Sequence, residues 1–441
     1  MLLRKRWDTL PPYLQTGNQV VGKHWVQCAF TMGPSYCSFG CTHCYLPKNA
    51  NRVPMLSLDD MKQQIRVNRE RIGEGGGIQI TGGDVVEAYW RAGKKDDLTE
   101  LIRYTVSLGL VPMLITHGQT LLDNPEYFIE LVELGGLRKI SCHIDITQAG
   151  RPGYSIRELN RESQLNPVRN RLVDLVMEVR RKTGYLVTAA QTVTVTSKNI
   201  SSMGEILQWL IARPQNMEVT RTISFQTEAQ VGRTLNQVNG ISPEQVWSEI
   251  ENTMGHSLPR DHLLFGHPDC SSTATIIARS SDGKVLPLCG EEPGIRQFWH
   301  QLLTTFSGIG ARREGVFQRF LIKLWLILRR PSILIHGIQF IASLRRYNGL
   351  DVGMIRSLIR GDAKGFNIVM HNFMSEKQAL NDSGCQTVKD RLNACSFRGA
   401  IEINGRWEEV PMCKVNALVR PLIYQEKVLD KNRATVIKFK S

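Results

Sequence analysis

Short apolar runs alternate with amphipathic, helix-like patterns between about residues 25 and 235. The runs that predict strands are His24–Thr31, Gly77–Thr81, Val111–Thr116, Lys139–Ile146, Tyr185–Val195 and Thr222–Gln226. Between two of these runs, Leu172, Leu175 and Val179 recur at helical spacing. Strands that alternate with helices predict βαβ units and a parallel sheet. Because about six repeats fall short of a full eight-fold barrel, we expect an α/β fold, a partial (β/α)6 barrel with its chemistry at the C-terminal ends of the strands.

Beyond residue 235 the pattern changes to two hairpin-like segments. One runs from Cys270 to Cys289 and the other from Cys395 to Cys413, with Asp-Gly and Asn-Gly respectively between their apolar halves. These dipeptides between apolar runs are strong hairpin signals. Since a hairpin returns to its starting point, we expect each pair of cysteines to be adjacent and to share a metal. The alternative is a pair of ordinary hairpins with buried free cysteines.

The stretch 316–347 is both apolar and basic. Its first half places six apolar residues on one helical face: Phe317, Phe320, Leu321, Leu324, Trp325 and Leu328. Arginine pairs follow at 329–330 and 345–346, and neither apolar run is long enough to span a bilayer. The pattern predicts either an interfacial helix on an anionic membrane or a helical hairpin packed on the open side of the barrel.

These changes in pattern divide the chain into five predicted regions. They are an N-terminal extension at 1–24, the barrel at 25–235, a first cysteine-hairpin region at 236–300, a basic apolar helical segment at 301–350 and a second cysteine-hairpin region at 351–441. The net charge of +14 calls for an anionic partner. No RNP, zinc-finger or helix-turn-helix signature is present, so we do not expect that partner to be nucleic acid.

The chain has ten cysteines and no secretory signal. We therefore expect a cytoplasmic protein, peripheral at the inner face of the membrane if the interfacial helix forms. In a reducing cytosol, clustered cysteines bind metal or carry out redox chemistry more often than they form disulfides.

The central motif is the run CSFGCTHCY at 37–45, in a loop after the first predicted strand. Cys37, Cys41 and Cys44 have the spacing C-x3-C-x2-C, and three thiolates can hold three irons of a [4Fe–4S] cube. The fourth iron is then free to chelate the amino and carboxylate groups of S-adenosylmethionine (SAM). The rival interpretation is a zinc site with His43 as the fourth ligand. His43 lies between two of the cysteines, where its side chain tends to point away, and zinc sites favour paired C-x2-C units.

This run resembles the signature of the radical SAM superfamily, and the resemblance places Tyr45 near the adenine of SAM. The family has Gly-Gly-Glu at the end of its second strand, against the amino group of SAM, and this chain has Gly82, Gly83 and Asp84 there. The glycines would let the backbone approach the ligand closely. Asp84 departs from the family glutamate and has a shorter reach. Asp145 ends the fourth predicted strand, a position from which family members contact SAM or substrate.

A second set of motifs spans the rest of the chain: Ser224-Phe225-Gln226, Gly232-Arg233, His267-Pro268-Asp269-Cys270, the run 368–374, Cys395 and Pro411-Met412-Cys413. Their order is similar to that in the tetraether-lipid-synthase-like branch, which carries auxiliary clusters. The resemblance implies that Cys270, Cys289, Cys395 and Cys413 ligate one or more auxiliary iron–sulfur clusters, with Cys385 as a candidate fifth ligand. Two further cysteines, Cys28 and Cys142, fall inside predicted strands and are interpreted as core residues.

Together these patterns predict a radical SAM enzyme that receives electrons from reduced ferredoxin or flavodoxin and removes hydrogen from an unactivated carbon. We expect the reaction to form a C–C bond or to transfer a methyl group. An apolar lid beside the site favours a lipid-like substrate. Two alternatives stay open. One is maturation of a peptide, and the other is a non-catalytic iron–sulfur or zinc protein, against which the motif at 82–84 argues.

Overall fold

The structure is a computed structural model. It describes residues 28–73, 75–234, 240–260, 266–305, 321, 324–325, 327–380, 384–403 and 405–429.

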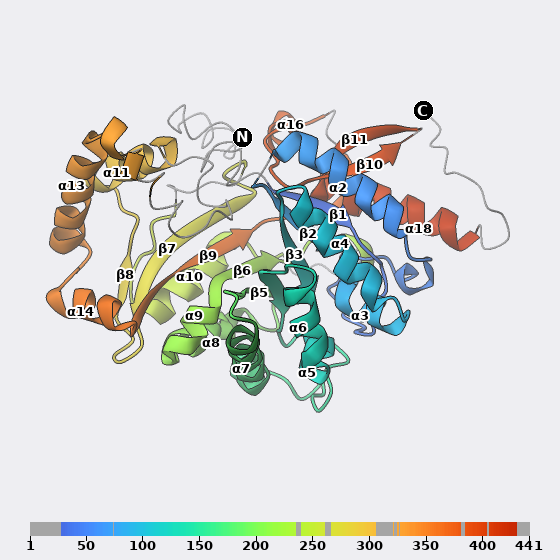
Figure 1. Ribbon diagram of the computed structural model, residues 1–441, viewed down its shortest axis with the longest axis horizontal. Helices are drawn as coiled ribbons and strands as arrows, with labels where there is room; N and C mark the ends of the chain where they lie inside the picture. Colours follow the sequence, from blue (N-terminus) through green and yellow to red (C-terminus); the bar gives the residue numbers. More distant parts are fainter. Residues whose placement is uncertain are drawn as a thin grey trace.

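Within these residues, eleven strands form one continuous sheet, in the order β11-β10-β1-β2-β3-β4-β5-β6-β9-β7-β8 (Figure 1). Its centre consists of β1 (Cys28–Met32), β2 (Gly77–Thr81), β3 (Val111–Thr116), β4 (Lys139–His143), β5 (Thr188–Val195) and β6 (Thr220–Thr227). Each of these strands pairs in parallel with the next. All six expected strands are therefore present, in an α/β fold whose mixed, mainly parallel sheet is consistent with a partial barrel.

Strands from the C-terminal half extend this sheet at both sides. β9 (Ala363–His371) pairs in parallel with β6, and β10 (Arg398–Ile403) pairs in parallel with β1. β7 (Ser271–Arg279), β8 (Val285–Pro287) and β11 (Arg406–Pro411) run antiparallel to their neighbours and complete the two hairpins. Both cysteine segments thus belong to the same sheet as the predicted barrel. The boundaries between the five regions stay predictions.

Helices of the first half cover the outer face of the parallel strands. They are α2 (Leu58–Ile72), α3 (Val85–Arg91), α4 (Lys95–Ser107), α5 (Gln119–Asp123), α6 (Pro125–Glu133), α7 (Asn166–Thr183), α8 (Met203–Ala212), α9 (Pro214–Val219) and α10 (Pro243–Met254). Short helical turns lie at Ala50–Arg52, Glu162–Leu165, Ile200–Ser202 and Gly232–Thr234. The main core forms between the apolar faces of these helices and the outward side chains of the strands. Val176 of α7, Leu114 of β3 and Ile140 of β4 are fully buried in it.

Local chemistry sets several of these helix ends. Ser57 caps α2 by accepting a hydrogen bond from the backbone of Asp60, whose side chain accepts one from Ser57 in return. Asp84 caps α3 through a single hydrogen bond, which its side chain accepts from the backbone of Glu87. α7 ends at Gly184, which adopts the left-handed conformation that glycine tolerates best.

Helices of the C-terminal half gather at the two ends of the sheet (Figure 1). α11 (Pro293–Thr305), α13 (Ser332–Tyr347) and α14 (Val352–Arg360) lie at the β7–β8 end. Towards the other end lie α15 (Glu376–Leu380), α16 (Gln386–Asn393), α17 (Met412–Lys414), the π-helical turn Val415–Val419 and α18 (Arg420–Leu429). α11 and α13 contact each other directly, with the rings of Phe298 and Phe340 stacked at 4.2 Å between centroids.

Candidate functional site

The cysteine loop follows β1 and lies at the C-terminal end of the parallel strands. Cys37, Cys41 and Cys44 line one cavity of about 1460 Å³ inside the sheet. The same cavity is lined by the glycine turn after β2 and by residues at the ends of β3 and β4. The cysteine loop and the glycine turn, which were predicted to act together, therefore lie at the same end of one cavity.

The glycine turn is the platform on which the cysteine loop packs. Gly83 donates a backbone hydrogen bond to the carbonyl of Pro34 at 2.7 Å, and Asp84 donates one to the carbonyl of Tyr36 at 2.8 Å. A Cβ atom on Gly82 would lie 2.4 Å from the Pro34 oxygen, and one on Gly83 would lie 2.0 Å from the Tyr36 oxygen. These glycines were predicted to let a ligand approach the backbone closely. In the structure, the backbone of the cysteine loop makes the close approach.

Tyr45 ties the far end of the loop to the same turn. Its hydroxyl donates to the carbonyl of Gly82 at 2.7 Å and lies 3.1 Å from the hydroxyl of Thr81. The guanidinium of Arg420 lies 5.2 Å from the centre of the Tyr45 ring. The phenol is therefore held at the cavity wall by two strand-end residues and a cation.

Asp84 is buried and its carboxylate is used within the protein. It accepts hydrogen bonds from the backbone of Glu87 at 2.8 Å, from the hydroxyl of Thr116 at 2.7 Å and from the backbone of His117 at 2.6 Å. Asp84 therefore links the ends of β2 and β3. Its predicted contact with SAM stays a prediction.

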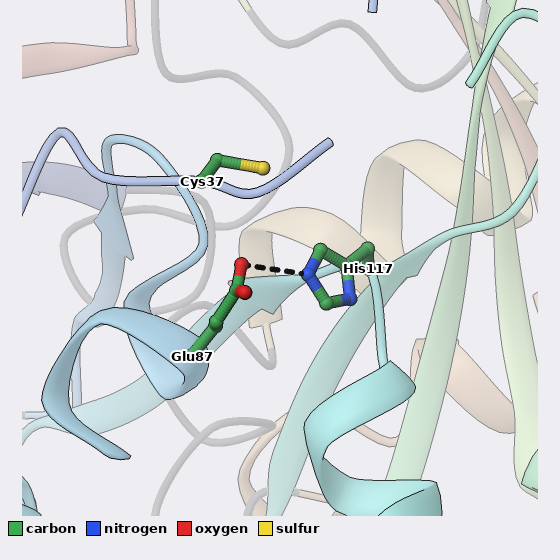
Figure 2. Close-up of side chains that lie close together, drawn as sticks. All are labelled: Cys37, Glu87 and His117. Atoms are coloured by element: carbon green, nitrogen blue, oxygen red, sulfur yellow. Dashed lines mark hydrogen bonds and ion pairs between the residues drawn. The ribbon is translucent and has the colours of Figure 1, made fainter. Parts of the chain in front are cut away.

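Beside Asp84 lies a cluster of Cys37, Glu87 and His117, whose ligand-type atoms are within 4.8 Å of one another (Figure 2). The Nε2 atom of His117 is 3.1 Å from Glu87, which also accepts the backbone N–H of Ser38 at 2.9 Å. Burial opposes ionisation of Glu87, but the hydrogen bonds from His117 and Ser38 lower its pKa to about 2. An ionised carboxylate thus anchors the loop next to Cys37.

Glu87 and His117 were not selected from the sequence. Glu87 stands three residues after the helix cap Asp84, and His117 directly follows β3. The signal that could have found His117 is its position at the end of a parallel strand, where functional side chains collect. Phe39 of the cysteine loop stacks on the His117 ring, with 3.9 Å between the ring centroids. The position of His117 therefore also depends on a residue that follows β1.

Residues after β6 hold the other side of the cysteine loop. His43 pairs with Glu228, with 2.7 Å between Nδ1 and Oε2. Arg233 donates its backbone N–H to the carbonyl of Cys44 at 3.0 Å. The pairing with Glu228 fixes the orientation of the His43 ring beside the cysteine loop and uses only its Nδ1 atom.

The three cysteines are partly buried, and this burial raises the pKa of their thiols and favours the neutral form. Burial and then the neighbouring Cys44 raise the pKa of Cys41 to about 12. The pKa of Cys37 is raised by burial and then by Asp84, and that of Cys44 by burial. Three thiolates here would need compensating positive charge, which iron ions provide. The donor set and the adjoining cavity therefore fit a cube-type cluster held by these three cysteines.

Asp145 does not face the cavity. It is fully buried, and its carboxylate lies 2.7 Å from Nε2 of His143 and accepts the backbone N–H of Thr194 at 2.9 Å. Burial opposes ionisation, but His143 and these hydrogen bonds lower the pKa of Asp145 to about 2. The residue that lines the cavity is His143. Asp145 therefore orients the ring of His143, and its predicted contact with SAM or substrate stays a prediction.

Three of the C-terminal cysteines gather, and two lie apart. Burial raises the pKa of Cys413 to about 12, with further contributions from Cys395 and Cys270. Arg391 lies close to this group and donates to the sulfur of Cys270 at 3.3 Å.

Cys289 lies apart because the arm of the hairpin from the turn to Cys289 is shorter than the arm to Cys270. The backbone of Leu288 pairs with Thr275, which places Cys289 about four residues, or roughly 13 Å, along β7 from Cys270. The two are not adjacent, unlike the expectation from the hairpin. Cys385 is exposed at the start of α16. Cys142 is a core residue as expected, whereas Cys28 lies at the wall of the cavity.

The walls of the cavity between its two ends carry both hydrogen-bonding side chains and apolar ones, such as Met113, Ile115 and Val369. The inward side chains of β4, β5, β6, β7 and β9 include Ser141, Thr188, Thr192, Thr194, Thr222, Ser224, Gln226, Thr273, Thr275 and Asn367. Packed barrels fill this space with bulky branched residues. Here the smaller polar residues leave it open. The cavity reaches from Lys139, the first residue of β4, to His143, the last.

Residues 34–209 match the family model described as the radical SAM superfamily. No curated protein matches the chain. Among solved structures, it is similar to native anSMEcpe with bound AdoMet, with 12% identity, a TM-score of 0.34 and coverage of 52% of this chain and 59% of that chain. It is also similar to native anSMEcpe with bound AdoMet and Cp18Cys peptide, with 11% identity, a TM-score of 0.35 and coverage of 70% and 99%. In the first of these matches the chain spans about three fifths of the known structure.

Proposed function

This chain is a radical SAM superfamily enzyme, with the family domain at residues 34–209, and from that premise we propose that it removes hydrogen from a polar, amide-rich substrate held inside the barrel. The observation that supports this proposal is the continuity of the cavity. One end is lined by Cys37, Cys41 and Cys44, and the walls beyond it carry hydroxyl and amide side chains among apolar ones.

The three cysteines of the loop would hold a [4Fe–4S] cluster, and Tyr45 and the turn at 82–84 would adjoin SAM. A bound cluster supplies the electron that splits SAM into methionine and a 5′-deoxyadenosyl radical. We propose reduced ferredoxin or flavodoxin as the source of that electron. The chain's own contribution is to fix the loop, through Glu87 on one side and Arg233 on the other.

We propose that Cys270, Cys395 and Cys413 ligate an auxiliary iron–sulfur cluster. The hydrogen bond from Arg391 to the Cys270 sulfur supports the proposal, as do the effect of Cys270 on the pKa of Cys395 and the effect of both on the pKa of Cys413. A thiolate cluster carries negative charge, which the guanidinium would offset. The position of Cys289, along β7 from this group, argues against its inclusion.

The hydroxyl and amide groups of the cavity walls favour a peptide over a lipid chain, and apolar wall residues such as Met113, Ile115 and Val369 would receive its apolar side chains. Some wall hydroxyls pair within the protein, as Ser141 does with Thr192. The hydroxyl of Thr273 has no hydrogen-bond partner among the described residues, and an apolar chain would leave it so, which costs free energy. Peptide bonds offer both donors and acceptors at regular spacing, so a peptide satisfies such walls. The apolar side chains of α13 that suggested a lid, such as Ile338 and Ile341, are exposed and do not line the cavity.

Lys139 lies at the end of the cavity opposite the cysteines, so the two ends of a bound substrate would meet different groups. It lies about 13 Å from His143 along β4. Burial lowers its pKa, and within the described part of the chain no carboxylate pairs with its ammonium. An unpaired ammonium at the wall of a cavity attracts an anionic group. We therefore propose that the far end of the substrate carries a carboxylate or a similar anion.

Replacing Lys139 by methionine should weaken binding of an anionic substrate without affecting SAM cleavage itself. A hydrogen bond to a charged group contributes about 1.5–3 kcal/mol, so we expect about a ten- to hundredfold loss. The probe is a mixed peptide library with free C-terminal carboxylates, compared with the same library amidated. In the wild type the free acids should raise 5′-deoxyadenosine formation more, and this preference should vanish in the variant.

Lys182→Met is the matched control, because Lys182 is an exposed lysine on α7 that pairs with Glu126 and Glu178. It should keep the preference. An equal response to both libraries in the wild type would contradict the assignment of Lys139.

A second candidate substrate is an amphiphilic lipid, and one observation favours it. Trp299 of α11 lines the cavity, and the preceding residue Phe298 stacks on Phe340 of α13. The exposed apolar side of α13 is therefore one helix layer from the cavity. A lipid with a polar head could reach the site from that side.

The proposed function is tested on the anaerobically purified wild-type protein. Iron and sulfide are counted, and SAM is supplied with a strong reductant. We expect about four irons for each cube-type cluster and formation of 5′-deoxyadenosine and methionine. Zinc in the three-cysteine loop, or intact SAM under strong reductant, would overturn the proposal.

A further inference from the structure

Exposed apolar side chains are concentrated at one end of the molecule. Of nineteen exposed large hydrophobic residues in the described part of the chain, thirteen lie between Leu321 and Ile359. Monomeric soluble proteins rarely expose contiguous apolar patches of this extent, and larger patches mark interaction surfaces. The concentration therefore calls for a partner.

Two helices carry most of this surface. On α13 the exposed residues Leu334, Ile335, Ile338 and Ile341 recur at helical spacing, and on α14 Val352, Ile355 and Ile359 do the same. The side chain of Ile338 is 70% exposed and that of Ile359 is 81% exposed.

The opposite sides of both helices are buried. Leu344 of α13 and Met354 of α14 pack in one apolar cluster with Leu286 of β8 and Ile295 of α11. The outward residues are therefore held in place by a core of their own. Figure 1 shows α13 and α14 at the same end of the molecule, beyond β7 and β8. The surface is thus a fixed feature of the fold.

Arginines surround this surface, and acidic residues are nearly absent from it. Arg329, Arg330, Arg345, Arg346, Arg356 and Arg360 are all exposed. The one acidic residue between positions 321 and 360 is Asp351, which already pairs with Lys284. None of the six arginines has an ion pair with another described residue. Trp325 and Tyr347, which favour the boundary between water and lipid, lie under Arg329 and Arg346.

We propose that the exposed face of α13 and α14, with its six arginines, docks in the plane of a bilayer that contains anionic lipid. Apolar side chains flanked by arginine are what in-plane attachment requires. Within the described residues no helix is long and apolar enough to cross a membrane, so the face would lie on the bilayer. A second copy of this chain fits less well, because it would bring six further arginines against the first six.

The sequence predicted part of this surface. Leu321, Leu324, Trp325 and Leu328 of the expected interfacial face are exposed, whereas Phe317 and Phe320 lie outside the described residues. The contribution of α14 was not expected. The proposal does not depend on SAM chemistry, so it can fail while the proposed function stands.

The test is co-sedimentation of the full-length protein with vesicles of phosphatidylcholine alone or mixed with phosphatidylglycerol. We expect the protein to bind the mixed vesicles and to be released by salt. The double variant Ile338→Glu/Ile341→Glu should weaken binding at least about tenfold, because it places charge in the apolar face. Arg345→Glu/Arg346→Glu should also weaken it, by about tenfold or more.

Two control variants test whether the loss of vesicle binding is specific to the exposed face of α13 and α14. Leu134→Glu adds charge at an apolar residue that is equally exposed but lies after α6, and Arg181→Glu reverses an exposed arginine on α7. Both should bind like the wild type, and all variants should keep the wild-type melting temperature. Wild-type binding by the α13 variants would overturn the proposal. So would equal binding to both vesicle types, or a dimer in vesicle-free solution that the α13 substitutions dissociate.

Discussion

Replacing Cys37, Cys41 and Cys44 together by alanine is expected to reduce 5′-deoxyadenosine formation to background. The loop holds the three thiols at the end of the cavity, and no other described cysteine belongs to that loop. About four irons per chain should be lost at the same time, while iron on Cys270, Cys395 and Cys413 should remain. Iron and sulfide counting and chromatography of the adenosine products measure the two effects.

Cys142→Ala is the control for this variant, because Cys142 is a fully buried core residue that lies away from the cavity. It should keep the wild-type iron and activity. SAM cleavage by the triple variant would contradict the role of the loop. Loss of all iron by the triple variant would instead contradict the second cysteine group.

Gly83→Ala is expected to disturb the same site although it replaces none of the cysteines. The added Cβ would lie 2.0 Å from the carbonyl oxygen of Tyr36, which is backbone and is held by the N–H of Asp84. The cysteine loop must then move away from β2. We expect the free energy of unfolding to fall by at least about 2 kcal/mol and SAM cleavage to fall at least about tenfold. Thermal melting and the rate of 5′-deoxyadenosine formation measure both changes.

Gly40→Ala is the matched control in the same loop. Gly40 is exposed, and a Cβ there would meet no atom within 4 Å. It should leave stability and cleavage nearly unchanged. Equal behaviour of the two variants would show that the packing of the loop on the glycine turn is unimportant for the site.

The central sheet could be predicted because its signals are local. Each of β1 to β6 is a short apolar run between helical patterns, and the structure has a strand at each of them. The additional strands could not be placed in the same way. β10 pairs with β1 although more than 360 residues separate Ala29 from Arg398. Such a pairing leaves no periodic signal in either segment.

The candidate site likewise contains features with a local sequence signal and features without one. The spacing of the three cysteines and the glycine turn are local patterns, and the structure brings both to one cavity. Asp145 was chosen instead of His143 because sequence cannot tell which residue of a strand end turns inward. His117 was missed because its partners, Glu87 and Phe39, come from other loops.

The pairing of β10 with β1 also constrains the order in which the protein can form during synthesis. The first described strand has its outer neighbour only after residue 398 has been made, since that neighbour is β10. Until then, one edge of the nascent sheet exposes unpaired N–H and C=O groups, which can pair with other chains. Truncation before residue 398 would make that exposure permanent. Expression of the first half alone is therefore expected to give aggregated protein.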